Sequence, residues 1–200
     1  MNNLFSLFLR AVLAFSIAVG APAALAGPQY QVSIDTSTLS GSSGFLSLNF
    51  IGGGDLGQSV ASVSNFRGNF VGTPLYDGDV VGDVSNGVTL SNTSFLSIFD
   101  QAVTFGGLFA FNVSFESGNE LLGTVFSAAL LNNARDGFLG ADADLFTIDL
   151  VPGEPDAVAV LAPGLAQVAQ VAEVPEPGEW LLLATGLLLI VATRRMQQRG

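Results

Sequence analysis

The sequence predicts an all-β fold, organised as a single β-sandwich or jelly-roll-like domain over residues 27–151. Apolar residues alternate with polar residues in several short stretches, as expected for strands that bury one face. Glycine-rich turns separate these stretches. No helical period of about ten or more residues occurs between positions 29 and 151, which excludes a helical domain there.

The first predicted strand covers residues 30–35, where Tyr30, Val32 and Ile34 alternate with polar residues. Further strands are predicted between turns rich in glycine, aspartate or asparagine, at residues 45–50, 60–66, 80–81 and 88–90.

The clearest alternation is at residues 109–115, where Phe109, Phe111 and Phe115 point one way and small or polar residues point the other. Residues 95–105 are expected to pair with this strand across the Gly106-Gly107 turn. Residues 125–131 and 145–151 bring the set to about eight or nine strands, a usual number for a two-sheet sandwich.

Phenylalanine is the dominant aromatic residue, with 16 in the chain, and most of them follow the strand period. This spacing favours packing between two facing sheets over an exposed binding platform. Because the chain has no cysteine, no disulfide can stabilise the fold, and burial of apolar side chains has to do so.

Residues 152–173 are predicted to be a linker that lifts the body off a membrane. The segment contains Pro152, Pro155 and Pro163 and is otherwise rich in alanine, valine and glutamine. The alternative interpretation is a final edge strand at residues 157–161.

The body is strongly acidic. The chain has a formal net charge of -11 and no lysine, and Arg67 and Arg135 are the only basic residues between the terminal segments. Such a negative field disfavours nucleic acid and anionic lipid surfaces as partners and is compatible with divalent cations or a neutral hydrated polymer.

Few residues are available for catalysis. The absence of histidine, cysteine and lysine removes the commonest general base, the zinc ligands, the thiol nucleophile and Schiff-base chemistry. A glycosidase-like carboxylate pair would have to use Glu116 and Glu120, which lie together in a turn where acids are usually solvated. We therefore predict no enzyme and no catalytic residues.

Aspartates in short glycine-containing loops suggest one candidate for a metal. Asp142 and Asp144 lie at alternate positions after Asp136-Gly137, and calcium favours oxygen ligands from such loops. Aspartate and glycine are also typical of ordinary turns. Calcium at Asp142 and Asp144 is thus the one candidate cofactor, and no other is predicted.

Residues 1–26 have the pattern of a secretory signal peptide. Arg10 is followed by an apolar stretch at residues 11–19 and by Ala24 and Ala26 in the A-x-A positions, so that cleavage would leave Gly27 first. The pattern predicts the Sec export machinery and signal peptidase as partners. An N-terminal membrane helix is the alternative, but small residues interrupt the apolar run too early for a span.

The last 27 residues, 174–200, combine a proline motif, an apolar run and a basic end. The motif comprises Val174, Pro175, Glu176 and Pro177. Trp180 opens a run of 14 residues, about 21 Å as helix, which is short against about 30 Å of hydrocarbon. Arg194 and Arg195 follow it and resist crossing the bilayer. We predict a transmembrane helix that anchors the protein transiently.

This tail resembles the PEP-CTERM sorting signal. The resemblance implies recognition by an exosortase, a membrane transpeptidase-like enzyme of Gram-negative bacteria that make exopolysaccharide, with cleavage at or near residues 175–177. It also implies an inner-membrane intermediate and a final location at the cell surface or in the extracellular matrix. The start of the body, at residues 30–41, 44–50 and 63–66, is similar to a group of small PEP-CTERM proteins with no assigned activity.

Two functions remain open from the sequence. One is a structural protein of the cell surface or the extracellular matrix, associated with exopolysaccharide or a biofilm. The other is a carbohydrate-binding module retained on the cell's own exopolysaccharide. Against the second, Trp180 is the only tryptophan and lies in the tail, and Tyr30 and Tyr76 are the only tyrosines.

Overall fold

The structure is a computed structural model that describes residues 28–52, 59–116, 123–151, 153–171 and residue 186. Gly27–Ala172 form one compact unit, and residues 1–26 with 173–200 are grouped separately. The signal peptide with Ala24, Ala26 and Gly27 lies outside the described residues, as do the sorting motif at 174–177 and the residues Trp180, Arg194 and Arg195. The predictions made for them stay predictions.

The described part of the chain contains strands and one short 3-10 turn. In chain order they are β1 (Gln29–Asp35), η1 (Ser37–Leu39), β2 (Ser43–Ile51), β3 (Val60–Arg67), β4 (Leu75–Asp77), β5 (Val80–Asp83), β6 (Gly87–Ser91), β7 (Leu96–Thr104), β8 (Leu108–Glu116), β9 (Thr124–Leu131), β10 (Phe146–Leu150), β11 (Ala157–Val160) and β12 (Ala166–Val171).

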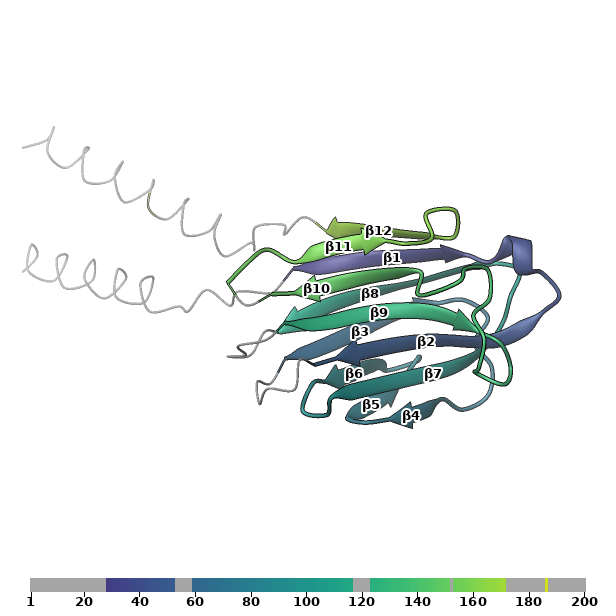
Figure 1. The fold of residues 1–200 in the computed structure, drawn as a ribbon, viewed down its shortest axis with the longest axis horizontal. Coiled ribbons are helices and arrows are strands. Elements are labelled where there is room, and N and C mark those ends of the chain that lie inside the picture. The colour runs from purple at the N-terminus through teal and green to yellow at the C-terminus, as the bar shows by residue number, and fades with distance from the viewer. Residues whose placement is uncertain (1–27, 53–58, 117–122, 152, 172–185, 187–200) are drawn as a thin grey trace, which may run out of the picture. The chain divides into compact units, whose positions relative to one another are not determined.

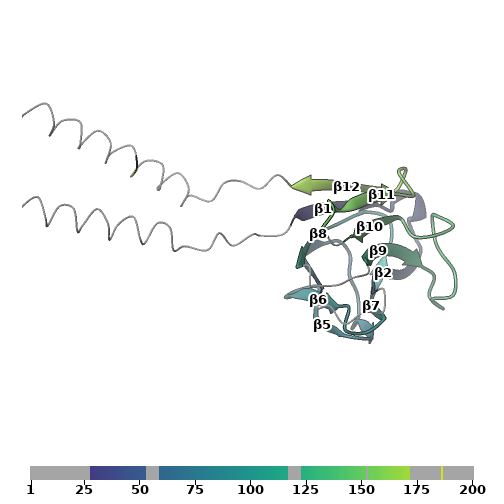
Figure 2. The same ribbon diagram turned by 60° about the vertical axis from the view of Figure 1, so that its left-hand side comes forward.

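The strands form two antiparallel sheets of six strands each (Figure 1). Sheet A has the order β12-β1-β8-β3-β6-β5, and sheet B has the order β11-β10-β9-β2-β7-β4. The two sheets face each other (Figure 2), an arrangement consistent with a β-sandwich. The all-β prediction is therefore confirmed.

Phenylalanine side chains fill the space between the sheets, as their spacing predicts. Six of them are fully buried: Phe50, Phe99, Phe109, Phe111, Phe126 and Phe146. Ring contacts cross from one sheet to the other, with centroids 5.7 Å apart for Phe115 and Phe126 and 6.2 Å apart for Phe66 and Phe99. These contacts add to the stabilisation that the buried area gives.

The expected hairpin between residues 95–105 and 109–115 is wrong. β7 pairs with β2 and β4 in sheet B, whereas β8 pairs with β1 and β3 in sheet A. The chain crosses between the sheets at Gly106-Gly107, where Gly106 has a φ of 120°. Thr36 holds this crossing: its hydroxyl donates to the Gly107 carbonyl at 2.7 Å and accepts from the Gly106 amide at 3.0 Å.

The linker predicted for residues 152–173 is also wrong, because this segment contributes a strand to each sheet. β11 pairs with β10, and β12 pairs with β1, so both complete the same side of the molecule. The alternative edge strand at 157–161 is confirmed as β11. Pro155 and Pro163 lie outside the strands, where a missing amide hydrogen breaks no ladder. β12 covers the edge of β1, and β11 covers the edge of β10. The segment is only weakly apolar, and its residues do not alternate clearly enough to predict a strand.

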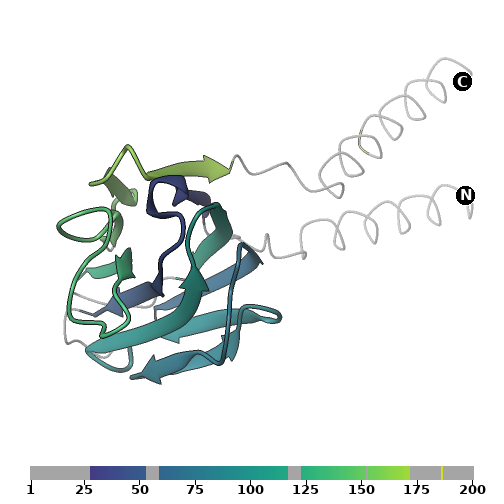
Figure 3. The same ribbon diagram turned by 90° about the vertical axis from the view of Figure 1, so that its right-hand side faces the viewer.

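The first and last strands of the body are neighbours. In the β1–β12 ladder Gln29 lies opposite Val171, so the body begins and ends at one point of its surface. The opposite end of the strands, called the distal end below, carries η1, the Gly106-Gly107 turn and the loop after β9 (Figure 3). Gln29 and Val171 thus lie away from this distal end.

The buried rings should dominate stability. Phe126→Ala removes a fully buried ring that contacts Phe115 and Phe146, and we expect the free energy of unfolding to fall by about 3–5 kcal/mol. Phe95→Ala is the matched control, because Phe95 is 70% exposed and should change stability by less than about 0.5 kcal/mol. Urea unfolding followed by circular dichroism measures both, and equal losses would contradict the assigned core.

A second stability prediction concerns Tyr30, whose hydroxyl donates to Asp156 Oδ2 at 2.9 Å and so ties β1 to the segment before β11. Burial of the ring, together with the Asp156 carboxylate, raises the pKa of Tyr30 above its ordinary value. The unfolded chain therefore loses this proton near pH 10 while the folded chain keeps it, so stability falls as the pH rises above about 10.

Tyr30→Phe should lower the free energy of unfolding by about 1 kcal/mol at neutral pH and should weaken its decline above about pH 10. Denaturant unfolding at pH 7 and pH 11 tests this. Tyr76→Phe is the control for the alkaline decline, because Tyr76 is 49% exposed and its hydroxyl donates to the Gly82 carbonyl at 2.7 Å and not to a carboxylate. An unchanged alkaline decline in the Tyr30 variant would contradict the assignment.

Candidate functional site

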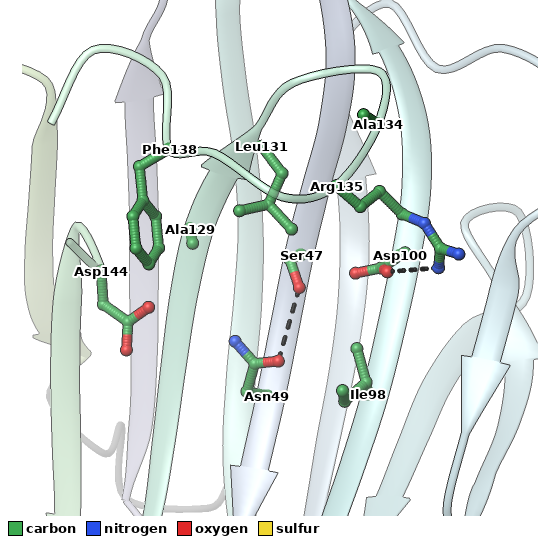
Figure 4. Close-up of a pocket in the computed structure, with 10 residues that line it drawn as sticks. All are labelled: Ser47, Asn49, Ile98, Asp100, Ala129, Leu131, Ala134, Arg135, Phe138 and Asp144. Atoms are coloured by element: carbon green, nitrogen blue, oxygen red, sulfur yellow. Dashed lines mark hydrogen bonds and ion pairs between the residues drawn. The ribbon is translucent and has the colours of Figure 1, made fainter. Parts of the chain in front are cut away.

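The outer face of sheet B carries an open pocket with a volume of about 390 Å³ (Figure 4). Strands β2, β7 and β9 form its floor, and the loop that follows β9 forms one side. Ser47, Asn49, Ile98, Asp100, Ala129 and Leu131 line the floor, and Ala134, Arg135, Phe138 and Asp144 line the side. The pocket lies toward the distal end of the body.

Local hydrogen bonds fold the loop after β9 back over the sheet. The Asn132 amide donates to the Gly137 carbonyl at 2.8 Å, and its side chain donates to Asp136 Oδ1 at 2.8 Å. Phe138 then forms a β-bridge with Leu131. Arg135 lies at the tip with a φ of 60°, in the left-handed region that costs energy for residues other than glycine. The turn therefore holds Arg135 above the outer face of β7.

Arg135 forms an ion pair with Asp100 on the floor of the pocket. Its Nη1 lies 3.0 Å from Asp100 Oδ2, with the aspartate side chain 7% exposed and the arginine side chain 44% exposed. The guanidinium carbon also lies 5.8 Å from the centre of the Phe45 ring, within the range of a cation–π contact. Arg135 thus compensates the charge of a nearly buried carboxylate.

The second oxygen of Asp100 has a different environment. Asp100 Oδ1 is buried and accepts no hydrogen bond from the described residues. Figure 4 shows it on the side of Ser47, which lies directly opposite Asp100 in the β2–β7 ladder. A buried acceptor without a donor costs free energy, so this oxygen favours any donor that reaches the pocket.

The polar side chains beside Asp100 are only weakly engaged. Ser47 Oγ donates to Asn49 Oδ1 at 3.4 Å, and Asn49 Nδ2 donates to Ser127 Oγ at 3.5 Å. Both distances exceed the usual range for protein hydrogen bonds. Phe138 stands on the side of the pocket and is 47% exposed. The pocket therefore combines an exposed aromatic ring with donors and acceptors that can exchange partners.

Asp144 is the only residue of the predicted calcium pair that lines the pocket, on its side, whereas Asp142 does not line it. In the described part of the chain no three carboxylates gather where they could hold a metal ion. The calcium site stays a prediction. Glu116 ends β8, and Glu120 lies outside the described residues, so their pairing is not addressed.

Sequence reasoning missed the residues on the pocket floor. Asp100 lies at a position of β7 whose side chain points away from the core, and Arg135 is one of two basic residues of the body. An acid on the outer face of an apolar strand and a scarce arginine are signals that could have been combined. The contact between Asp100 and Arg135 depends on the conformation of the loop after β9, and the alternation of apolar and polar residues does not predict the conformation of a loop.

Comparisons with protein-family models, with curated proteins and with solved structures find no match for this chain. Within the residues that the structure describes, no helix has both the length and the apolar character that crossing a membrane requires.

The ion pair gives a third prediction. Arg135→Gln leaves the buried Asp100 carboxylate without its cation and should lower the free energy of unfolding by about 1–2 kcal/mol. This loss is smaller than for a fully buried ion pair, because Arg135 is half exposed and water screens its charge. Arg67→Gln makes the same charge change at an exposed position and should cost less than about 0.5 kcal/mol.

A double-mutant cycle isolates the contact itself. Once Asp100→Asn is present, Arg135→Gln should cost about 1 kcal/mol less than it does alone, because the carboxylate it compensates is gone. Urea unfolding of the four proteins gives this coupling energy. Additive losses would show that the ion pair contributes nothing measurable.

Proposed function

We propose that this chain is an exported structural protein of the cell surface or extracellular matrix, sorted and processed by an exosortase. One observation carries the proposal: the order of proline motif, apolar run and arginines in residues 174–200. A short apolar run suits a transient anchor, and the prolines before it keep the backbone extended, as an enzyme at the membrane surface requires.

The body supports this proposal in two ways. It has its own buried core and lacks cysteine, so its folding after export requires no disulfide chemistry. Its first and last strands pair with each other at Gln29 and Val171, which leaves the distal end clear of the two chain connections. A domain held at one end suits a protein displayed outward.

The proposed role is non-catalytic. The body lacks histidine, cysteine and lysine, and its pocket contains one carboxylate paired with arginine and one aspartate on the side. A structural role in an exopolysaccharide-containing matrix uses the stable sheets and the acidic surface directly. Its partners in this proposal are the Sec machinery, signal peptidase and the exosortase.

Processing can be tested by mass spectrometry of the protein recovered from the surface of cells that carry an exosortase. We expect the mature form to end at or near residues 175–177 and to lack Arg199. Replacing both prolines, Pro175→Ala with Pro177→Ala, should leave the uncut chain in the inner-membrane fraction. Pro163→Ala, outside the motif, should be processed normally.

A mature surface form that still contains Arg199 would overturn the proposed processing. Equal processing of the motif variant and the Pro163 variant would show that the motif is not the signal read by the enzyme.

A further inference from the structure

We propose that the pocket on the outer face of sheet B binds a neutral, hydroxylated ligand, namely the sugar rings of a glycan. Asp100 accepts a hydrogen bond from a ligand hydroxyl, and Phe138 packs against the apolar face of a ring. This inference rests on the geometry of the pocket and does not depend on how the chain is sorted.

Asp100 is the central element of the site. The side chain is 7% exposed, its Oδ2 is paired with Arg135 at 3.0 Å, and its Oδ1 is buried with no donor among the described residues. Because this oxygen is buried, a side chain at the rim, such as Arg135 with 44% exposure, has to shift before a ligand hydroxyl reaches it. A ligand that supplies a hydroxyl beside Ser47 satisfies an acceptor that the protein leaves unpaired.

The charges around Asp100 select a neutral ligand. A divalent cation is disfavoured because the Arg135 guanidinium already compensates this carboxylate and would repel a second cation. An anion is disfavoured because Asp100 and Asp144 both line the pocket and the chain has a net charge of -11. Uncharged groups that donate and accept hydrogen bonds remain.

Sugars match the remaining lining. Asn49 can donate and accept, and its hydrogen bonds of 3.4 Å from Ser47 and 3.5 Å to Ser127 are long enough to be exchanged for bonds to ligand hydroxyls, whereas Ser47 itself is buried. Phe138, with 47% exposure, supplies an apolar surface on one side of the pocket, and Ile98 lies across the floor from it (Figure 4). A pyranose ring has the same division between a hydroxyl rim and apolar C–H faces.

The size and place of the pocket agree with a glycan. A volume of about 390 Å³ is near the lower end of the roughly 300–1,000 Å³ typical of ligand sites, enough for about one or two sugar rings. The pocket is open rather than enclosed, so neighbouring rings of a polymer can continue along the sheet. It also lies beside the loop after β9, at the distal end, away from Gln29 and Val171.

The test is a screen of the full chain, purified in a detergent without a sugar headgroup, against an array of neutral glycans. Hits are then measured by isothermal titration calorimetry and saturation-transfer-difference NMR. We expect Asn49→Ala and Phe138→Ala each to weaken binding about tenfold, because they remove a hydrogen-bonding group and the aromatic surface. Asp100→Asn should also weaken binding, since it loses the charge-assisted acceptor.

Phe95→Ala is the matched control, because it removes an exposed phenylalanine outside the pocket and should leave affinity unchanged. Circular dichroism and thermal melting confirm that each variant is folded, and the exposed Phe138 keeps the test interpretable if Asp100→Asn unfolds. The proposal fails if no neutral glycan binds at millimolar concentration, or if Phe138→Ala and Asn49→Ala bind as well as the unaltered chain.

Parallel titrations with calcium chloride and with a simple alkylamine separate the other ligand classes. Calcium or amine binding that is lost in Asp100→Asn, without glycan binding, would also overturn the proposal. Glycan binding that is lost after Asn49→Ala and after Phe138→Ala, with no binding of calcium or alkylamine, would support it.

Discussion

Contacts between phenylalanine rings across the two sheets are the interaction on which the rest of this structure depends. Phe115 of sheet A lies within ring-contact distance of Phe50 and Phe126 of sheet B, and these side chains are almost completely buried. With no cysteine in the chain, this packing replaces the covalent cross-links common in small exported domains. Because the inner faces carry the stability, the outer faces are available for polar side chains such as Asp100.

The sequence predicts the strands well and their partners poorly, for a physical reason. A period of two residues shows which side chains a strand buries, but strands from both sheets bury theirs in the same core. β7 and β8 therefore look like two halves of a hairpin although they belong to different sheets. β12 was missed, and β11 was predicted only as an alternative to a linker, because alanine, valine and glutamine give a weak pattern. Both become strands by pairing with the open edges of β1 and β10.

The pocket could be predicted only in part. Asp100 and Arg135 are 35 positions apart in the sequence. Their contact requires that the Asp100 side chain points outward from β7 and that the tight turn after β9 brings Arg135 back over the sheet. Asp144, for which the sequence suggests calcium, lies on the side of the pocket together with Phe138. Composition had counted against a sugar platform because tyrosine and tryptophan are scarce. The exposed ring of Phe138 shows that aromatic surface depends on loop placement as well as residue type.

The antiparallel pairing of β12 with β1 also has a mechanical meaning. A body held through the chain beyond Val171 and loaded at its distal end would be pulled along its strands. The six residue pairs from Gln29–Val171 to Ile34–Ala166 would then share the load in shear. A pull across the ladder would instead open the pairs one after another, like a zipper. The edge strand that ends at Val171 is thus oriented to withstand a pull along the strands.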